Sequence, residues 1–408
     1  MTDSTFDVVI AGGGVAGMTT ARELAARDLS VLVVDRHLPG RATSASAGGL
    51  WPIGEAVGLG CGVIYQATRQ PIGSTVADGA DAVPESLPEV FRDFLVASNS
   101  MFPELSASLL DETGIDIELD PGPGLLFLMQ TIGQQSVVDN IARGLPDGCV
   151  LELLSPDDVR ELEPAVSPDI VGGALLPGEH QVNPMLLTEA CKRSALTRGA
   201  RFQHDRLVDE ILREGDRVTG VRIGDDTISC RHVVNAAGAW AGRLAATAGV
   251  SIPVEPVRGQ VVLTEALEPL LGTCLSTSSC YLAQKRHGEV LIGSTTEHVG
   301  FDTGVTEEGI GGLCRGAARA VPSLTHARIK RTWAGLRPGT PDELPILGGV
   351  AGLDGYSHVA GGFRTGIVAA PLMARVAAQH IGHETPEVAM GDYLAARFDH
   401  EDSLPAHS

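Results

Sequence analysis

The first 35 residues contain an apolar run, then small residues, then a run of good helix formers, and then a second apolar run. Residues Phe6–Ala11 form an apolar run rich in Val and Ile, as expected of a buried parallel strand. Residues 16–27 are mostly good helix formers, with apolar positions along one face. Ser30–Val34 is a second apolar run, and it ends at Asp35. The pattern predicts a strand–helix–strand unit at the start of the chain.

Beyond this unit the chain divides into helical segments and short strands separated by turns that contain Gly and Pro. Helices are expected over residues 84–113 (interrupted at Pro103), 155–163, 183–198, 309–321 and 367–381. Strands are expected over residues 115–129, in a meander over 200–234, over 232–236, across 252–295 as an antiparallel sheet, and over 329–333 and 356–360. The pattern predicts an α/β fold, α+β overall, in which a Rossmann-like domain carries an inserted antiparallel-sheet domain.

Three glycines follow the first strand at the spacing G-x-G-x-x-G. Gly12 permits a tight turn, Gly14 lets a pyrophosphate approach bare backbone, and Gly17 lets the helix pack close to the strand. The anion would then lie at the positive end of the helix. Asp35, eighteen residues after Gly17, is placed to accept hydrogen bonds from an adenosine ribose, and an acid there argues against NADP. The unit predicts a dinucleotide site.

Three later loops are also rich in glycine and other small residues. Residues 41–49 are nearly all small, with Thr43 and Ser44 able to hydrogen-bond phosphate or ribitol. Asn-Ala-Ala-Gly follows the strand at 232–236, and Gly-Gly-Phe-Arg-Thr-Gly at 361–366 opens the last helix. The N-terminus of that helix would stabilise a cofactor that becomes anionic on reduction. Sites at both ends of the chain fit an extended FAD better than NAD, so we expect FAD.

Composition and charge narrow the choice of partners. The 408 residues suffice for two domains, and the net charge of −21 argues against nucleic-acid or anionic-membrane binding. No apolar run reaches the ~18 residues of a membrane span, and no signal peptide precedes the first strand, so we expect a cytoplasmic protein. The seven cysteines show no C-x-x-C spacing, which argues against a metal or iron–sulfur site. The sequence leaves a homo-oligomer open.

Four motifs, together with the opening glycines, resemble one known family. They are Thr43–Gly49, Asn235–Trp240, Trp333–Gly339 and Gly361–Ile367. They resemble the D-amino-acid oxidase superfamily of FAD-dependent amine oxidases, and within it the glycine oxidase branch, over almost the whole chain. The motifs are most similar to the flavoprotein subunit of hydrogen cyanide synthase, notably over Ala45–Tyr65, Ile292–Asp302 and Lys330–Leu347.

The resemblance implies a substrate site built around two arginines. The family binds the substrate carboxylate with arginines that match Arg337 and Arg364, and with a tyrosine that matches Tyr281. A guanidinium suits this role because it meets a carboxylate with two hydrogen bonds and stays charged. Glycine oxidases have His where this chain has Gly362, which predicts a more open wall and a bulkier substrate. Residues 333–340 contain no Cys, so the FAD is expected to be non-covalent.

The expected cofactor site collects residues from all of these loops. It comprises Gly12, Gly14, Val15, Ala16, Gly17, Asp35, Arg36, Thr43, Ser44, Ala47, Gly48, Gly49, Val208, Ala237, Gly238, Trp240, Gly361, Gly362, Phe363, Arg364, Thr365, Gly366 and Ile367. We expect residues 1–95, 168–245 and 335–395 to form the FAD-binding domain, and 96–167 and 246–334 to form the substrate-binding domain. No side chain is expected to act as general acid or base, because the cofactor supplies the chemistry and the protein supplies orientation.

These observations predict an oxidoreductase that oxidises the Cα–N bond of glycine or an N-substituted glycine. Hydride would pass to flavin N5, the imine would hydrolyse to glyoxylate and an amine, and O2 would be reduced to H2O2. The nearest alternative is the flavoprotein subunit of a cyanide-forming glycine dehydrogenase, which passes electrons to partner subunits. Another is an enzyme of secondary metabolism that removes an N-carboxymethyl group from a β-amino acid. Two hypotheses from other functional classes are an NAD-dependent dehydrogenase and a non-catalytic flavoprotein.

Overall fold

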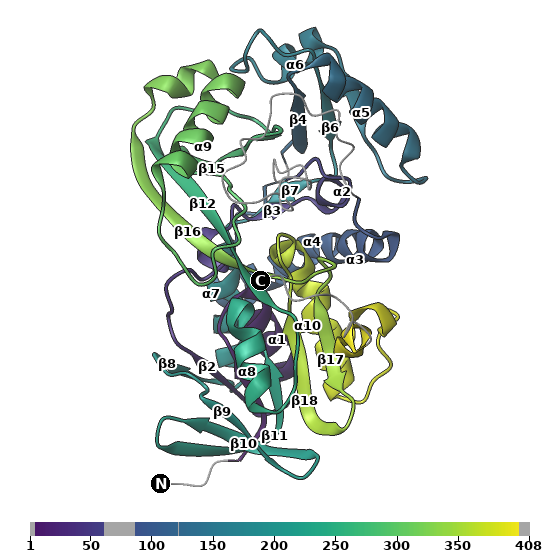
Figure 1. The fold of residues 1–408 in the computed structure, drawn as a ribbon, viewed down its shortest axis with the longest axis vertical. Coiled ribbons are helices and arrows are strands. Elements are labelled where there is room, and N and C mark those ends of the chain that lie inside the picture. The colour runs from purple at the N-terminus through teal and green to yellow at the C-terminus, as the bar shows by residue number, and fades with distance from the viewer. Residues whose placement is uncertain (1–4, 61–85, 121, 400–408) are drawn as a thin grey trace.

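The structure is a computed structural model that describes residues 5–60, 86–120 and 122–399. Its framework is two eight-stranded sheets. In Figure 1 the first sheet and its helices fill the lower half, and the second sheet fills the upper half. A two-stranded sheet of β3 (Gly49–Leu50) and β7 (His180–Gln181) lies between them. Among the helices of these ranges, none is long and apolar enough to cross a membrane.

The first sheet has a parallel centre and an antiparallel rim. Its order is β17-β18-β10-β11-β1-β2-β8, with β9 paired to β10, and β1 runs parallel to both β2 and β11. Both faces of β1 are covered, which explains its unbroken apolar sequence. The strands are β1 (Phe6–Ala11), β2 (Val31–Asp35), β8 (Arg201–His204), β9 (Glu210–Glu214), β10 (Arg217–Ile223), β11 (Asp226–Asn235), β17 (Ile346–Val350) and β18 (Leu353–Ala360).

Five helices pack over one face of the first sheet and form the largest hydrophobic core with it. They are α1 (Val15–Ala25), α3 (Glu89–Ser100), α4 (Phe102–Thr113), α7 (Pro184–Thr197) and α10 (Gly366–Ile381). Helix α10 is buried along most of its length, and α1 packs directly against it. The predicted break at Pro103 is confirmed as the boundary between α3 and α4. Helix α1 also contacts β18, the strand that precedes α10.

The second sheet is mainly antiparallel and has the order β16-β12-β15-β14-β13-β4-β6-β5. Its strands are β4 (Leu125–Met129), β5 (Glu152–Leu154), β6 (Gly172–Leu176), β12 (Glu255–Ala266), β13 (Cys274–Ser276), β14 (Tyr281–Gln284), β15 (Glu289–Gly293) and β16 (Ile329–Gly339). The remaining α-helices are α2 (Pro52–Ala56), α5 (Ile132–Gly144), α6 (Pro156–Leu162), α8 (Ala241–Thr247) and α9 (Glu307–Ala320). Short 3₁₀ helices cover Thr43–Ala45, Gly238–Trp240, Pro322–His326, Gly391–Tyr393 and Ala395–Phe398.

Three predicted elements differ from the structure. Residues 115–119 are not a strand, because Ile117 packs into the helical core and its carbonyl accepts from Asn183 N at 2.9 Å. Strand β8 does not join the meander but pairs in parallel with β2, and Val208 lies in the connection after it rather than on an inner strand. The loop predicted after Trp333 is the second half of β16, which pairs with β12 over its whole length.

The two sheets suggest a different division of the chain from the predicted domain boundaries. Strand β6 belongs to the second sheet, although residues 168–245 were predicted to lie in the cofactor domain. Strand β16 crosses the predicted boundary at 334/335, and the helices over 96–113 pack on the first sheet. We therefore propose that β6 and all of β16 belong to the substrate-binding domain, and α3 and α4 to the cofactor domain. Residues 61–65 and Cys61, singled out in the sequence, lie outside the described ranges.

Two histidines lie in the first sheet, His358 buried and His232 half-buried. His358 on β18 is 0% exposed, and neither ring nitrogen has a hydrogen-bond partner among the described residues. Burial lowers the pKa of His358 to about 4. His232 on β11 lies with Nε2 2.9 Å from Ser357 Oγ. Burial, helped by the charges of His380 and His383, lowers the pKa of His232 to about 3. Both side chains are therefore neutral in the folded protein at neutral pH.

Acid should destabilise the fold through these histidines. Above about pH 6.5, the ordinary histidine pKa, the His358 imidazole is neutral in both the folded and the unfolded chain. Its contribution to the free energy of unfolding is then fully present. As the pH falls toward the folded-state pKa of about 4 for His358, the unfolded chain takes up a proton that the folded chain excludes. The free energy of unfolding should fall by roughly 2 kcal/mol at pH 5 from this group alone.

Urea unfolding at pH 7.5 and pH 5 measures this effect. His358→Phe should lose less stability between the two pH values than the wild type. The same substitution at His326, which is exposed, should leave the pH dependence unchanged. A His358→Phe protein with the wild-type pH dependence would contradict this account.

Candidate active site

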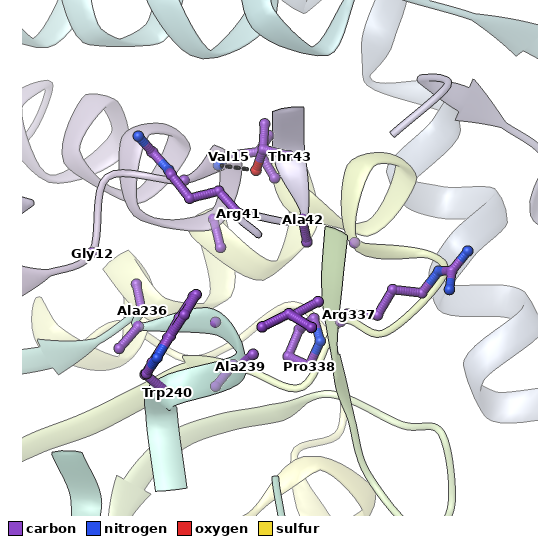
Figure 2. A pocket seen from close by; sticks show the side chains of 18 of the residues that line it. Gly12, Val15, Arg41, Ala42, Thr43, Ala236, Ala239, Trp240, Arg337 and Pro338 are labelled. Atoms are coloured by element: carbon purple, nitrogen blue, oxygen red, sulfur yellow. Dashed lines mark hydrogen bonds between the residues drawn. The ribbon is translucent and has the colours of Figure 1, made fainter. Parts of the chain in front are cut away.

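A cavity of about 380 Å³ runs between the first sheet and the second and collects most of the predicted site residues. Those that line it are Gly12, Gly14, Val15, Ala16, Asp35, Arg36, Thr43, Ala47, Gly49, Val208, Ala237, Gly238, Trp240, Tyr281, Arg337, Gly361, Gly362, Phe363, Arg364, Gly366 and Ile367. Gly17, Ser44, Gly48 and Thr365 do not line it. Figure 2 shows residues from four separate segments around this cavity.

The turn after β1 is closed by backbone contacts that only glycine permits. Gly12 has φ +116°, and a Cβ there would lie 2.2 Å from the carbonyl oxygen of Ala236. A Cβ on Gly17 would lie 1.9 Å from the carbonyl oxygen of Gly12. The first glycine therefore lets β1 meet the loop after β11, and the third lets α1 meet the turn. The N-terminus of α1 faces the cavity at Gly14 and Val15.

Thr43 supports the N-terminus of α1 at the cavity wall. Its Oγ1 accepts a hydrogen bond from Val15 N at 3.1 Å, as Figure 2 shows. Because the oxygen accepts this bond, its own hydrogen stays available to donate into the cavity. The neighbouring Ser44 behaves differently, since its Oγ donates to Arg41 O at 3.0 Å. The two hydroxyls that the sequence treated alike thus have separate roles.

Asp35 is held at the end of β2 by two donors. Its Oδ1 accepts from Gly13 N at 2.8 Å, and its Oδ2 lies 3.2 Å from Nη1 of Arg41. The same guanidinium donates from Nη2 to Gly13 O at 2.6 Å. Arg41 thereby places a positive charge beside the glycine turn, where a pyrophosphate would lie.

The loop after β11 is shaped by a buried amide. Asn235 is 0% exposed and donates from Nδ2 to Ala241 O at 2.9 Å and to Tyr356 Oη at 3.0 Å. Its Oδ1 accepts from Ala237 N at 3.2 Å. This network turns the chain so that Ala237 and Gly238 line the cavity. Figure 2 shows Ala236, Ala239 and Trp240 of the same loop.

The start of α10 forms the far end of the cavity. Gly361 has φ +73°, and Phe363 N donates to Pro338 O at 3.2 Å. A Cβ on Gly362 would lie 2.9 Å from Gly366 Cα, so the close approach of this turn to the helix requires glycine. The more open wall expected from Gly362 stays a prediction, because the glycine is already explained by the turn.

Arg337 faces the cavity from the end of β16. Its Nη1 donates to Thr295 O at 3.0 Å, and its Nη2 donates to Ser294 Oγ. Both partners are uncharged, and no carboxylate of the described residues forms an ion pair with this guanidinium. Its full positive charge therefore acts on whatever occupies the cavity.

Arg364 is placed differently. Its side chain is 3% exposed, its Nη2 lies 2.6 Å from Glu343 Oε2, and its Nε lies 3.8 Å from Glu55 Oε2. Its guanidinium also lies 5.1 Å from the centre of the Phe363 ring. Two acids therefore offset much of its charge, so the two arginines of the expected clamp are not equivalent.

Aromatic rings complete this end of the cavity. Tyr281 is 4% exposed, and its ring meets that of Trp51 edge to face, with ring centres 5.5 Å apart. A Cβ on Gly49 would lie 2.5 Å from the Trp51 ring, so the indole lies over bare backbone. Behind the wall, Lys285 donates from Nζ to Ala47 O and to Gln181 Oε1, and burial lowers the pKa of this lysine.

The charges around the cavity fit FAD. The lining includes five arginines and three acids, so it is net positive although the chain carries −21. The arginines are Arg36, Arg41, Arg243, Arg337 and Arg364, and the acids are Asp35, Glu55 and Asp209. A pyrophosphate is an anion that backbone N–H groups and arginines bind. The bare glycine turn, the positive lining and the elongated set of loops suit a dinucleotide in an extended form.

Sequence reasoning missed several cavity residues. Arg41 opens the small-residue segment, and its place six residues after Asp35, the acid expected to bind the ribose, was the available signal. Trp51 was not among the predicted site residues. Glu55, Ser294 and Arg243 gave no signal, because their roles depend on segments that are distant in the sequence.

Comparisons with known proteins agree with this geometry. A family model described as FAD dependent oxidoreductase (DAO) matches residues 7–380. The hydrogen cyanide synthase subunit HcnC of Pseudomonas aeruginosa is 43% identical over 98% of both chains. A glycine oxidase of the same organism is 32% identical over 95% of this chain and 98% of that protein. The crystal structure of glycine oxidase from Geobacillus kaustophilus matches with a TM-score of 0.83 at 28% identity, over 96% of this chain and 99% of that one.

Thr43→Val should weaken FAD binding, because the variant cannot accept from Val15 N or donate into the cavity. We expect the FAD dissociation constant to rise about tenfold, the effect of losing one or two hydrogen bonds. Titration of the apoprotein with FAD, followed by quenching of flavin fluorescence, measures this. Ser44→Ala is the matched control and should bind as the wild type does. Equal affinities of both variants and the wild type would refute the role of Thr43.

Proposed function

The chain belongs to the DAO family of FAD-dependent oxidoreductases, and we propose that it oxidises the Cα–N bond of glycine or of an N-substituted glycine. The net reaction consumes the amino acid, O2 and water, and yields glyoxylate, the free amine and H2O2. FAD, when bound, supplies the redox step by accepting the hydride at N5. The protein contributes binding and orientation of the substrate.

The observation that carries this proposal is the uncompensated charge of Arg337 inside the cavity. Its two partners are a carbonyl and a hydroxyl, so a substrate carboxylate would be the ion that completes its coordination. The residue stands on β16, whose Leu336 N donates to Gly40 O at 2.7 Å in the cofactor loop. A carboxylate bound there would be close to the cofactor segment of the cavity.

The surrounding side chains support a small substrate. We propose that the Tyr281 hydroxyl contacts the same carboxylate and that the Trp51 and Tyr281 rings exclude water beside it. Arg364 adds positive charge at the far end, although Glu343 and Glu55 offset part of it. Arg337 is therefore the principal carboxylate ligand in this proposal, and Arg364 is secondary.

A second candidate function is favoured by the similarity to HcnC. The 43% identity extends over 98% of both chains, whereas the glycine oxidase of the same organism is 32% identical. HcnC is named as a subunit of hydrogen cyanide synthase, so this chain would then deliver electrons to partner subunits instead of O2. The amino-acid site proposed above serves both functions, and the electron acceptor separates them.

The purified holoprotein given glycine in air should form glyoxylate and H2O2 in equal amounts. Flavin bleaching by glycine or N-substituted glycines without O2 tests the first half-reaction, and peroxide release after air is admitted tests the second. Bleaching that is reversed by an artificial electron acceptor but hardly by O2 would favour the subunit function. A flavin that none of these amino acids bleaches would refute the proposed chemistry.

Arg337→Ala should lower kcat/KM for the amino acid by about 10- to 150-fold, because a charge-assisted interaction of roughly 1.5–3 kcal/mol is lost. Steady-state kinetics measure this with the substrate that bleaches the flavin most readily. Arg331→Ala is the matched control, since Arg331 lies on the same strand but is exposed, with its guanidinium 4.9 Å from the centre of the Trp333 ring. A kcat/KM within twofold of the wild type for Arg337→Ala would exclude the carboxylate role.

A further inference from the structure

Gly259 on β12 lies directly beneath the guanidinium of Arg337. A Cβ at Gly259 would lie 2.3 Å from Arg337 Nη1 and 2.5 Å from both Cζ and Nη2. Strand register explains the contact, because Arg337 pairs with Val257 and its side chain leans one diagonal step along β12. Gly259 itself lines the cavity. The guanidinium therefore lies against bare backbone.

Two acceptors also hold the guanidinium. Thr295 O and Ser294 Oγ receive its hydrogen bonds from the segment after β15. The backbone at Gly259 and these acceptors together leave the head group little freedom. How far Arg337 reaches into the cavity is thus set by the absence of a side chain at residue 259.

The same arrangement recurs one strand away. A Cβ at Gly293 on β15 would lie 2.4 Å from the hydroxyl oxygen of Tyr281, so that phenol also rests on a glycine. Gly293 pairs with Val261 of β12 and with Tyr281 of β14. Arg337 and Tyr281, the two proposed ligands of the substrate carboxylate, therefore both pack against glycines of the second sheet.

We propose that Gly259 is a positioning residue that sets the depth at which Arg337 binds the substrate carboxylate. This inference rests on the proposed function of Arg337. A methyl group at 259 would meet the end of a long side chain rather than backbone, so the fold can accommodate it by moving the guanidinium away from its two acceptors. The displaced guanidinium would enter the space of the substrate and lose its alignment with a bound carboxylate.

The test combines Gly259→Ala and Arg337→Ala in a double-mutant cycle. Acetate is the probe, and its binding to the oxidised holoprotein is followed by the change in flavin absorbance. Gly259→Ala should weaken acetate binding about tenfold in the wild-type background, through the displaced charge-assisted hydrogen bonds. In the Arg337→Ala background it should change binding by less than about twofold, because nothing remains to be displaced. Gly144→Ala is the control, since a Cβ there meets nothing within 4 Å.

Kinetics with an amino acid that the enzyme oxidises give a second readout. Gly259→Ala should raise KM about tenfold while the rate of flavin reduction at saturation changes less. An equal loss of acetate binding in both backgrounds would show a general structural effect and overturn the proposal, as would unchanged binding in Gly259→Ala. No acetate response in the wild type would overturn it together with the carboxylate role of Arg337. If acetate binds as expected but no amino acid is oxidised, the proposed function fails and the role of Gly259 stands.

Discussion

The site depends on backbone packed directly against backbone where β1 ends. Gly12 and Gly17 bring three elements to one point: the turn after β1, the first turn of α1, and the loop after β11. Any side chain at these two positions would overlap a carbonyl oxygen. The N-terminus of α1 faces the cavity next to this contact, and Thr43 Oγ1 accepts from one of its N–H groups, that of Val15. The rest of the cavity is arranged around this fixed point.

Charge is distributed unevenly over the molecule. The chain carries −21 in total, yet arginines outnumber acids around the cavity. The surface field therefore disfavours anions in general, and the cavity attracts them locally. Within the cavity the arginines differ, because Arg41 and Arg364 have acid partners while Arg337 has neutral ones. A family motif identifies such arginines but does not show which of them keeps its charge for a ligand.

Much of the fold could be predicted because local patterns agreed with tertiary packing. The apolar runs of β1 and β2 favour buried strands, and the glycines between them favour a tight turn. Tertiary packing requires the same structure at these positions. Failures came where long-range pairing overrode local signals. The Gly and Pro residues near Arg337 favour a loop, but pairing with β12 keeps them in strand β16. The alternating residues 115–119 favour a strand, but the helical core takes up Ile117. The contacts of Arg337 with Gly259 and of Arg364 with Glu343 depend on residues far apart in sequence, and no local pattern encodes them.

Strand β16 has a mechanical consequence. It belongs to the second sheet through β12, yet its Leu336 N bonds to Gly40 O and its Pro338 O accepts from Phe363 N. The main chain that carries Arg337 is therefore hydrogen-bonded to cofactor loops from both ends of the polypeptide. A hinge between the two sheets would have to break these bonds, so the halves should move as one body. A rigid connection of this kind would keep Arg337 at a constant position relative to the cofactor loops while small molecules enter and leave the cavity.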